Sequence, residues 1–279
     1  MSVMKKQKIW SIVLGTYLLC YIFRVWEYFV LRTDQTWVGE AIVHKIIGIL
    51  ILLAVSAGAK LTITQIGFVK GKALCNLLKG LAFGCAVFVL AYSVEIAIAA
   101  MQGSFRSLQL YVSAYAISRN TGYRTEILFF LICIIGNIVN VVMEEGIFRG
   151  LFQKLLEQKY SFLVSAIIAS CLFGVWHMIG PVRNYADGTM SMSGMIANIV
   201  MLVVTSTLVG FKFAMLTQMT GSLYMAMGDH FVNNTIVNLL HVVSDTGADE
   251  MMVIRVAIAQ SVSFILVLVC YICRCRKKV

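Results

Sequence analysis

Charged residues are scarce in this chain of 279 residues. Only 13% are Asp, Glu, Lys or Arg, whereas 60% are hydrophobic and the mean hydropathy is +0.87. Soluble domains have about 25% charged and roughly 45–50% apolar residues, and they keep much of their surface polar. The composition therefore excludes a soluble globule, a disordered chain and a coiled coil. It predicts an all-α polytopic membrane protein, whose length allows about eight helices of about 20 residues each.

Proline is nearly absent, and no Pro-, Gly- or Ser-rich linker, internal repeat or low-complexity tract interrupts the sequence. This favours a single membrane domain over residues 1–279. The only proline, Pro181, directly follows the fifth apolar window, where a helix is expected to stop. The apolar windows lie near 9–31, 41–59, 75–101, 127–157, 161–180, 195–216, 221–243 and 252–273.

The formal net charge of +10 is explained by membrane topology more simply than by nucleic-acid binding. With both termini in the cytoplasm, most Lys and Arg between the windows fall on the inner side. The N-terminus reads MSVMKKQK, and the apolar run that follows has no small-residue cleavage site, so we expect this run to be a retained span. We expect a multi-pass protein of a bacterial cell membrane. We expect interfacial helices in 60–74 and 102–126. The outer loops carry Arg32, Arg106, Arg119, Arg124 and Arg183.

Cysteines give little functional signal. Four lie in apolar runs, where a free thiol behaves as a small hydrophobe. Near the C-terminus a C-x-x-C-x-C cluster leaves two interpretations open, a metal site and lipid-adjacent thiols, of which we favour the second. The four are Cys20, Cys85, Cys133 and Cys171, and the cluster is Cys270, Cys273 and Cys275.

Two common hydrolase signatures are missing. No G-x-S-x-G motif and no locally paired Cys and His occur, so no covalent nucleophile is evident. H-E-x-x-H is also absent, which argues against a conventional zinc protease. A metal held by Glu144, His177 and His230 nevertheless stays open, because all three are acceptable zinc ligands.

Polar residues interrupt three of the apolar windows, where an ionisable side chain costs about 2.5–3.5 kcal/mol at mid-bilayer. Glu145 and Arg149 are four residues apart and can pair on one helix face, while Glu144 points about 100° away. The segments are Val142-Met143-Glu144-Glu145-Gly146-Ile147-Phe148-Arg149, Phe173-Gly174-Val175-Trp176-His177 and Asp229-His230-Phe231-Val232-Asn233-Asn234.

Helix register brings these segments to a shared depth. Ser161 is expected to cap the helix after a turn at 159–162. Glu144 and His177 are equally far from that turn, roughly 25 Å along antiparallel helices. His230 and Asn234 share one face of the seventh window, roughly 14–20 Å from its start. We therefore predict one polar layer inside the membrane.

This layer suits hydrolysis. A carboxylate beside an imidazole can deprotonate water, and a histidine with an asparagine can donate hydrogen bonds to an oxyanion. The residues match the pattern E-E-x-x-x-R, F-x-x-x-H and H-x-x-x-N, in that order, on three helices. The sequence thereby resembles the CAAX protease and bacteriocin-processing family of intramembrane endopeptidases, which includes the type II CAAX prenyl endopeptidases. The resemblance covers roughly residues 127–241.

The resemblance implies an eight-helix membrane core and a role for each matched residue. Glu144 would activate water and His177 would position it or share its proton, while His230 and Asn234 would form the oxyanion site. The remaining matched residues would support the site, Glu145 and Arg149 as an orienting pair and Phe173 as packing. We favour a metal-free mechanism, with zinc as the alternative cofactor.

Each of these residues could instead have a purely structural role. Glu145 and Arg149 alone would suit a buried structural pair, and His177 with Trp176 would suit an interfacial anchor. His44, Lys45 and His241 are interpreted as interfacial groups. Four further ionisable residues in the windows have no predicted partner; they are Glu95, Lys212, Asp229 and Arg255.

The leading functional hypothesis is an intramembrane endopeptidase. Its expected partners are the lipid bilayer and a membrane-associated peptide or prenylated protein, such as a CAAX protein, a bacteriocin leader or a signal peptide, with no nucleic acid. The alternatives are a transporter that uses the buried polar residues as a translocation path and a non-catalytic immunity protein. Transporters often contain repeated halves, and none is visible in this sequence.

Overall fold

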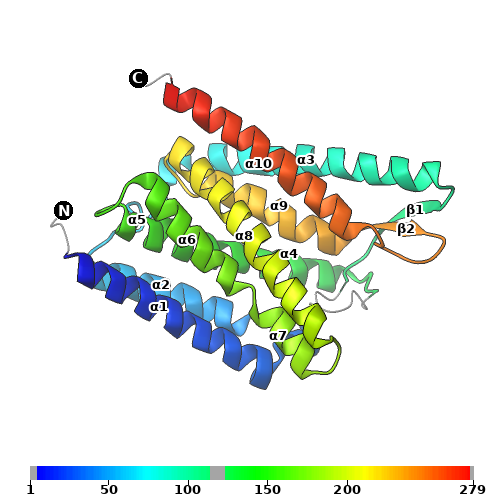
Figure 1. The fold of residues 1–279 in the computed structure, drawn as a ribbon, viewed down its shortest axis with the longest axis horizontal. Coiled ribbons are helices and arrows are strands. Elements are labelled where there is room, and N and C mark those ends of the chain that lie inside the picture. The colour runs from blue at the N-terminus through cyan, green and yellow to red at the C-terminus, as the bar shows by residue number, and fades with distance from the viewer. Residues whose placement is uncertain (1–4, 114–122, 277–279) are drawn as a thin grey trace.

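The computed structural model describes residues 5–113 and 123–276, which form a bundle of helices running side by side (Figure 1). The first part contains α1 (Lys6–Trp26), η1 (Glu27–Leu31), η2 (Thr33–Gln35), α2 (Val43–Gly58), η3 (Lys70–Lys72), α3 (Ala73–Met101) and β1 (Phe105–Leu110). The second part contains α4 (Ile127–Glu145), η4 (Gly146–Phe152), α5 (Gln153–Leu156), α6 (Phe162–Trp176), α7 (Ile179–Ala186), α8 (Met192–Thr220), α9 (Tyr224–Leu239), β2 (Leu240–Ser244) and α10 (Met252–Arg276).

The all-α polytopic membrane fold is confirmed. Among the described residues, six helical segments are long and apolar enough to cross a membrane: Lys6–Gln35, Lys70–Met101, Ile127–Leu156, Phe162–Ala186, Met192–Thr220 and Met252–Arg276. The other two apolar windows contain α2 and α9, each of 16 residues. A 16-residue helix is about 24 Å long, less than the roughly 30 Å of a bilayer core. The two chain ends lie at the same end of the bundle (Figure 1).

Neither predicted interfacial helix is present in the described residues. The segment 60–69 consists of turns, and η3 is a single 3₁₀ turn before α3. In the second segment, β1 pairs with β2 as an antiparallel two-stranded sheet, with Leu110 opposite Leu240. The sheet lies at the end of the bundle opposite the chain termini (Figure 1). Residues 114–122, which include Arg119 of the topology argument, lie outside the described residues.

Glycines allow α3 and α9 to approach each other closely. A Cβ atom on Gly80 of α3 would lie 2.2 Å from the backbone oxygen of Met225. On the facing α9, a Cβ on Gly228 would lie 2.6 Å from the backbone oxygen of Leu77. Small residues at a helix crossing permit such backbone contact in membrane bundles. This contact fixes the depth of α9, which carries His230 and Asn234.

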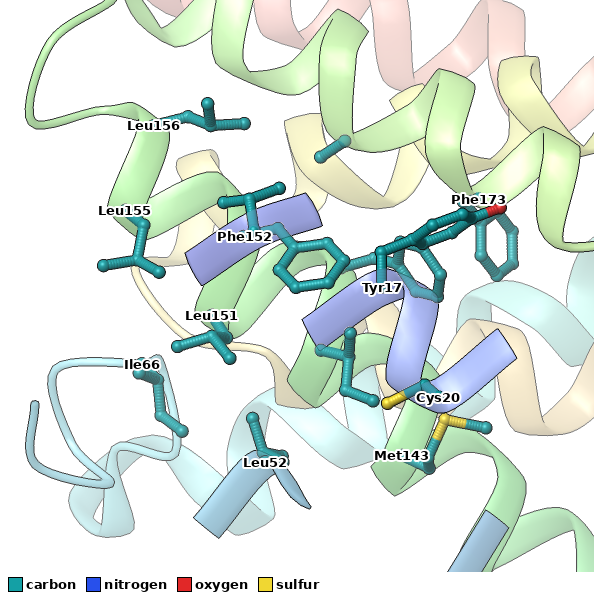
Figure 2. Close-up of a cluster of buried hydrophobic side chains, with 14 of the residues drawn as sticks. Tyr17, Cys20, Leu52, Ile66, Met143, Leu151, Phe152, Leu155, Leu156 and Phe173 are labelled. Atoms are coloured by element: carbon teal, nitrogen blue, oxygen red, sulfur yellow. The ribbon is translucent and has the colours of Figure 1, made fainter. Parts of the chain in front are cut away.

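A hydrophobic cluster packs the first two helices against η4 and α6. Tyr17 from α1, Leu52 from α2, Phe152 from η4 and Phe173 from α6 belong to this cluster, which Figure 2 shows. Phe148 in the same cluster is 1% exposed, and its ring centroid lies 5.2 Å from that of Phe173. The cluster therefore holds α1 beside the end of α4, where Glu144 and Glu145 lie.

A π-helix begins directly after Glu145. Segment η4 covers seven residues, including two glycines whose neighbours leave no room for a side chain. A Cβ on Gly146 would lie 2.5 Å from Leu52 Cδ2, and one on Gly150 would lie 2.7 Å from the backbone oxygen of Ile66. Single π-helical turns inside α-helices occur frequently at functional sites. Here the change of helix type falls within the E-E-x-x-x-R motif.

Candidate active site

Glu144 is the centre of the buried polar layer, and its side chain contacts four different elements. The Trp176 indole Nε1 donates a 3.0 Å hydrogen bond to Oε1, and the Asn140 amide donates a 3.2 Å hydrogen bond to Oε2. His230 Nε2 lies 3.5 Å from Oε2, and Arg24 Nη1 lies 3.7 Å from Oε1. Because Glu144 is only 3% exposed, these donors replace much of the hydration that a carboxylate requires.

His230 lies between the two glutamates of the motif. Its Nδ1 is 2.8 Å from Glu145 Oε1, while its Nε2 faces Glu144. Glu145 Oε1 also lies 3.3 Å from Arg149 Nη1, which is the pair expected from the i,i+4 spacing. The Arg149 guanidinium lies over the Phe173 ring, 4.0 Å from its centroid. Because a carboxylate accepts hydrogen bonds, His230 Nδ1 is the donor to Glu145.

His177 follows the last residue of α6, and its ring orientation is fixed by the backbone. Nδ1 lies 2.8 Å from the carbonyl oxygen of Phe173. Because a carbonyl only accepts hydrogen bonds, Nδ1 carries a proton and Nε2 is the basic nitrogen of the neutral ring. The residue before it, Trp176, donates to Glu144. The predicted convergence of α4 and the end of α6 therefore occurs, and Ser161 caps α6 by accepting from the Val164 backbone N–H.

Asn234 is one helical turn beyond His230 on α9, as the sequence spacing requires. Its side chain is half-buried, and its Oδ1 accepts a 3.0 Å hydrogen bond from Asn233 Nδ2. The structure thus places His230 between Glu144 and Glu145, and places His177 directly after Trp176, which donates to Glu144. Asn234 lies on the same face of α9 as His230, and its amide oxygen is held by its sequence neighbour.

Three residues that contact Glu144 were missed as site residues from the sequence. Trp176 is 1% exposed and donates to Glu144, so its interpretation as an interfacial anchor is wrong. Asn140 could have been found, because it precedes Glu144 by one helical turn. Arg24 also carried a signal, since a cation within the first apolar window requires a partner.

The residues interpreted as interfacial are also buried or paired. His44 is 2% exposed, and its Nδ1 lies 2.5 Å from Glu27 Oε2. Lys45 Nζ lies 3.2 Å from Glu40 Oε2. His241 is 0% exposed on β2 and pairs with Asp249. Their partners lie only five to seventeen residues away in the sequence, in the segments next to α2 and β2, and hydropathy does not report such pairing.

The four ionisable residues without predicted partners form two buried ion pairs. Lys212 Nζ lies 2.8 Å from Asp229 Oδ2, which joins α8 to α9. Arg255 Nη1 lies 2.7 Å from Glu95 Oε2, which joins α10 to α3. Charged side chains within membrane bundles are expected to pair in this way.

Metal coordination was the alternative for the site. Within 5–113 and 123–276, no group of three or more His, Cys, Asp or Glu side chains is arranged to hold a metal ion. Cys270, Cys273 and Cys275 are exposed free thiols. Each imidazole of the site has its Nδ1 engaged, His177 by a carbonyl and His230 by Glu145. Their Nε2 atoms are therefore the ones that face a reacting water or a ligand.

The arrangement contains the parts that peptide hydrolysis requires. A buried carboxylate lies near a histidine with a free basic nitrogen, which suits deprotonation of a water molecule. A second histidine and an amide follow each other on one helix face, which suits stabilisation of an oxyanion. All of these groups lie on α4, α9 or the end of α6.

Comparison with protein families gives one match. Residues 126–236 match the family described as type II CAAX prenyl endopeptidase Rce1-like. The matched region begins just before α4 and ends within α9, so it contains all the residues of the predicted site. No curated protein matches the chain.

Proposed function

We propose that the chain, whose residues 126–236 match the family of Rce1-like type II CAAX prenyl endopeptidases, hydrolyses a peptide bond within the membrane through water activated by Glu144. The observation that carries the proposal is the cluster around Glu144. Its carboxylate, 3% exposed, lies 3.5 Å from His230 Nε2 and accepts a hydrogen bond from Trp176, which directly precedes His177. Burying ionisable side chains inside a membrane costs free energy, and residues buried in this way commonly form a functional site.

In the proposed reaction, Glu144 accepts a proton as the water oxygen attacks the scissile carbonyl carbon. His177 Nε2 orients this water. The carbonyl oxygen becomes an oxyanion that accepts hydrogen bonds from His230 Nε2 and Asn234 Nδ2. The tetrahedral intermediate then collapses, the C–N bond breaks, and the proton held by Glu144 moves to the leaving amine.

The Glu145 carboxylate has a separate role in this scheme. It contacts both His230 Nδ1 and Arg149 Nη1, at 2.8 and 3.3 Å. A histidine held at one nitrogen has a fixed direction for the other, so Glu145 aims His230 Nε2 into the site. Arg149, 0% exposed, in turn holds Glu145 in place. The pair is therefore proposed to position His230 and to stabilise η4 against α4.

The proposed substrate is a membrane-associated peptide or a prenylated protein. A prenylated C-terminal segment is favoured by the family match. A lipid-attached substrate would approach from the bilayer, where a single acyl or prenyl chain supplies marginal, reversible anchoring.

The proposed mechanism requires no metal ion, because Glu144 and His177 together can remove a proton from water. Zinc would have to be held by Glu144, His177 and His230, which the described structure does not arrange as a metal-binding group, and it would supply a bound water of lowered pKa. One measurement distinguishes the metal-free mechanism from the zinc-dependent mechanism. We expect full activity after dialysis against a chelator and no stoichiometric zinc in the purified protein, whereas activity restored only by added zinc would contradict the metal-free version.

Substrate class is tested by cleavage assays in proteoliposomes. Matched peptides with a C-terminal CAAX sequence, one farnesylated and one with the free cysteine, are incubated with the wild type and with Glu144→Ala. We expect cleavage of the farnesylated peptide by the wild type only. If Glu144→Ala cleaves as fast as the wild type while remaining folded, the proposed function is wrong. If only the peptide without the lipid is cleaved, the prenyl preference is wrong.

A further inference from the structure

A chain of hydrogen bonds runs from a buried lysine to Asn234 through side chains that the proposed reaction does not use. Lys212 on α8 donates to Gln260 Oε1 on α10, with a distance of 3.1 Å. Gln260 Nε2 donates to Asn233 Oδ1 on α9, at 2.5 Å. Asn233 Nδ2 then donates to Asn234 Oδ1, at 3.0 Å. We call this chain the amide relay.

The direction of the relay is set by its first member. A lysine ammonium group has three donors and no acceptor, so the atom of Gln260 facing Lys212 must be the oxygen. The other end of that amide is then its NH₂ group, which requires an acceptor on Asn233. By the same reasoning, Asn233 presents its NH₂ group to Asn234. The Asn234 amide is therefore oriented with its oxygen toward Asn233.

Two neighbouring side chains hold the Lys212 ammonium group in place, so the donor-to-acceptor direction of the relay is fixed. Its side chain is 1% exposed, and its Nζ lies 2.8 Å from Asp229 Oδ2 and 3.0 Å from Ser263 Oγ. The adjacent carboxylate is the partner that a buried ammonium group requires. The relay thus begins at a fixed cation and not at a group that can exchange donor and acceptor roles.

We propose that the amide relay orients Asn234 so that its NH₂ group, and not its oxygen, faces the reacting carbonyl. Asn233 and Asn234 are consecutive on α9, so their side chains leave the helix about 100° apart. Asn233 is directed toward α10, where Gln260 lies, while Asn234 shares a face with His230. With its oxygen occupied by Asn233, Asn234 offers two N–H donors to an oxyanion.

An unrestrained asparagine would lose part of this effect. An amide can rotate so that its oxygen faces the substrate, and an oxygen there would repel the developing negative charge. Preorganised donors stabilise a transition state because they need no reorientation when the charge develops. In this scheme Gln260 and Asn233 are positioning residues, and they act on kcat through Asn234.

This inference rests on the proposed function, and a double-mutant cycle tests it on the full chain in proteoliposomes. Gln260→Met replaces the relay amide with an apolar side chain of similar length. Removal of an oxyanion donor costs about 10²–10³ in kcat, so loss of its orientation is expected to lower kcat about 10- to 100-fold, with KM changed less than about twofold. In the Asn234→Ala background, Gln260→Met should lower kcat no further.

A second pair of variants tests the direction of the relay. Asn233→Asp places an acceptor next to Asn234, which draws the Asn234 NH₂ group away from the site. Asn233→Ala only removes the restraint. We therefore expect Asn233→Asp to lower kcat more than Asn233→Ala does. Ser263→Ala is the matched control, because it removes a partner of Lys212 and leaves the relay complete; its kcat should equal that of the wild type.

The outcomes separate the two proposals. Equal kcat in Gln260→Met and the wild type would overturn the relay. The relay would also be overturned if Gln260→Met lowered kcat in the Asn234→Ala background as much as it does in the wild-type background. A larger loss in Asn233→Ala than in Asn233→Asp would overturn its direction. Full activity of Glu144→Ala would instead overturn the proposed function on which the relay rests.

Discussion

The charge of Arg24 is expected to be essential for activity, although this residue lies on α1, outside the region that matches the family. Its guanidinium group lies over the Trp176 ring, 4.5 Å from the centroid, and its Nη2 donates to the Tyr28 hydroxyl at 3.3 Å. Its side chain is buried, and its Nη1 lies 3.7 Å from Glu144 Oε1. Arg24 is therefore a cation held in place next to the proposed base.

The magnitude follows from the distance. Two unit charges 3.7 Å apart attract with about 4 kcal/mol at an effective dielectric constant of about 20. Each ~1.4 kcal/mol corresponds to a tenfold change in rate. Without this attraction Glu144 takes up a proton more readily, and a protonated carboxyl cannot accept a proton from water. Allowing for partial compensation by the nearby histidines, Arg24→Gln should lower kcat/KM about 10²- to 10³-fold.

Three variants separate charge from hydrogen bonding in a peptide-cleavage assay. Arg24→Gln removes the charge and keeps a polar side chain, while Arg24→Lys keeps the charge. Tyr28→Phe removes only the hydroxyl that accepts from Arg24. We expect partial rescue in Arg24→Lys and near wild-type activity in Tyr28→Phe. Equal activity of Arg24→Gln and the wild type would refute the electrostatic argument, as would equal losses in the Gln and Lys variants.

Three predictions concern stability in detergent. Gly80→Ala should lower the free energy of unfolding by about 3 kcal/mol or more, because its Cβ would lie 2.2 Å from a backbone oxygen. Gly15→Ala is the control: a Cβ there has nothing within 4 Å, so the free energy of unfolding should change by less than about 0.5 kcal/mol. Phe148→Ala should cost about 3–5 kcal/mol in the same unfolding titration, because a large cavity would form in the cluster of Figure 2. Burial raises the pKa of Asp249, but hydrogen bonds from His241 and Arg255 outweigh it and hold this pKa below its ordinary 3.8. Its stabilising effect should therefore be complete above about pH 5 and fade as the pH falls below about 4, so the melting temperatures of wild type and Asp249→Asn should converge there.

Local sequence patterns predicted the helices and much of the site. Among the described residues, hydropathy located the six helical segments that are long and apolar enough to cross a membrane, because burial in lipid imposes a strong and continuous signal. Spacing along single helices placed Glu145 beside Arg149, and the antiparallel register of α4 and α6 brought Glu144 near His177. These are short-range relations, fixed by 3.6 residues per turn and one tight turn.

Relations between distant segments were not predictable in this way. The pairing of β1 with β2 joins strands more than a hundred residues apart, and neither strand carries a turn signal next to its partner. The ion pair of Glu27 with His44 and the contact of Arg24 with Glu144 depend on how α1 packs against α2 and α4. A single sequence shows that a buried charge needs a partner and does not show which partner it has.

The most direct test of the account is the rate of peptide cleavage by Glu144→Gln in proteoliposomes. This substitution keeps the size of the side chain and removes its capacity to accept a proton from water. Glu157→Gln, in the turn between α5 and α6, is the matched control. We predict that Glu144→Gln lowers cleavage to background with its fold intact, while Glu157→Gln cleaves like the wild type. Cleavage by folded Glu144→Gln at the wild-type rate would contradict the central claim.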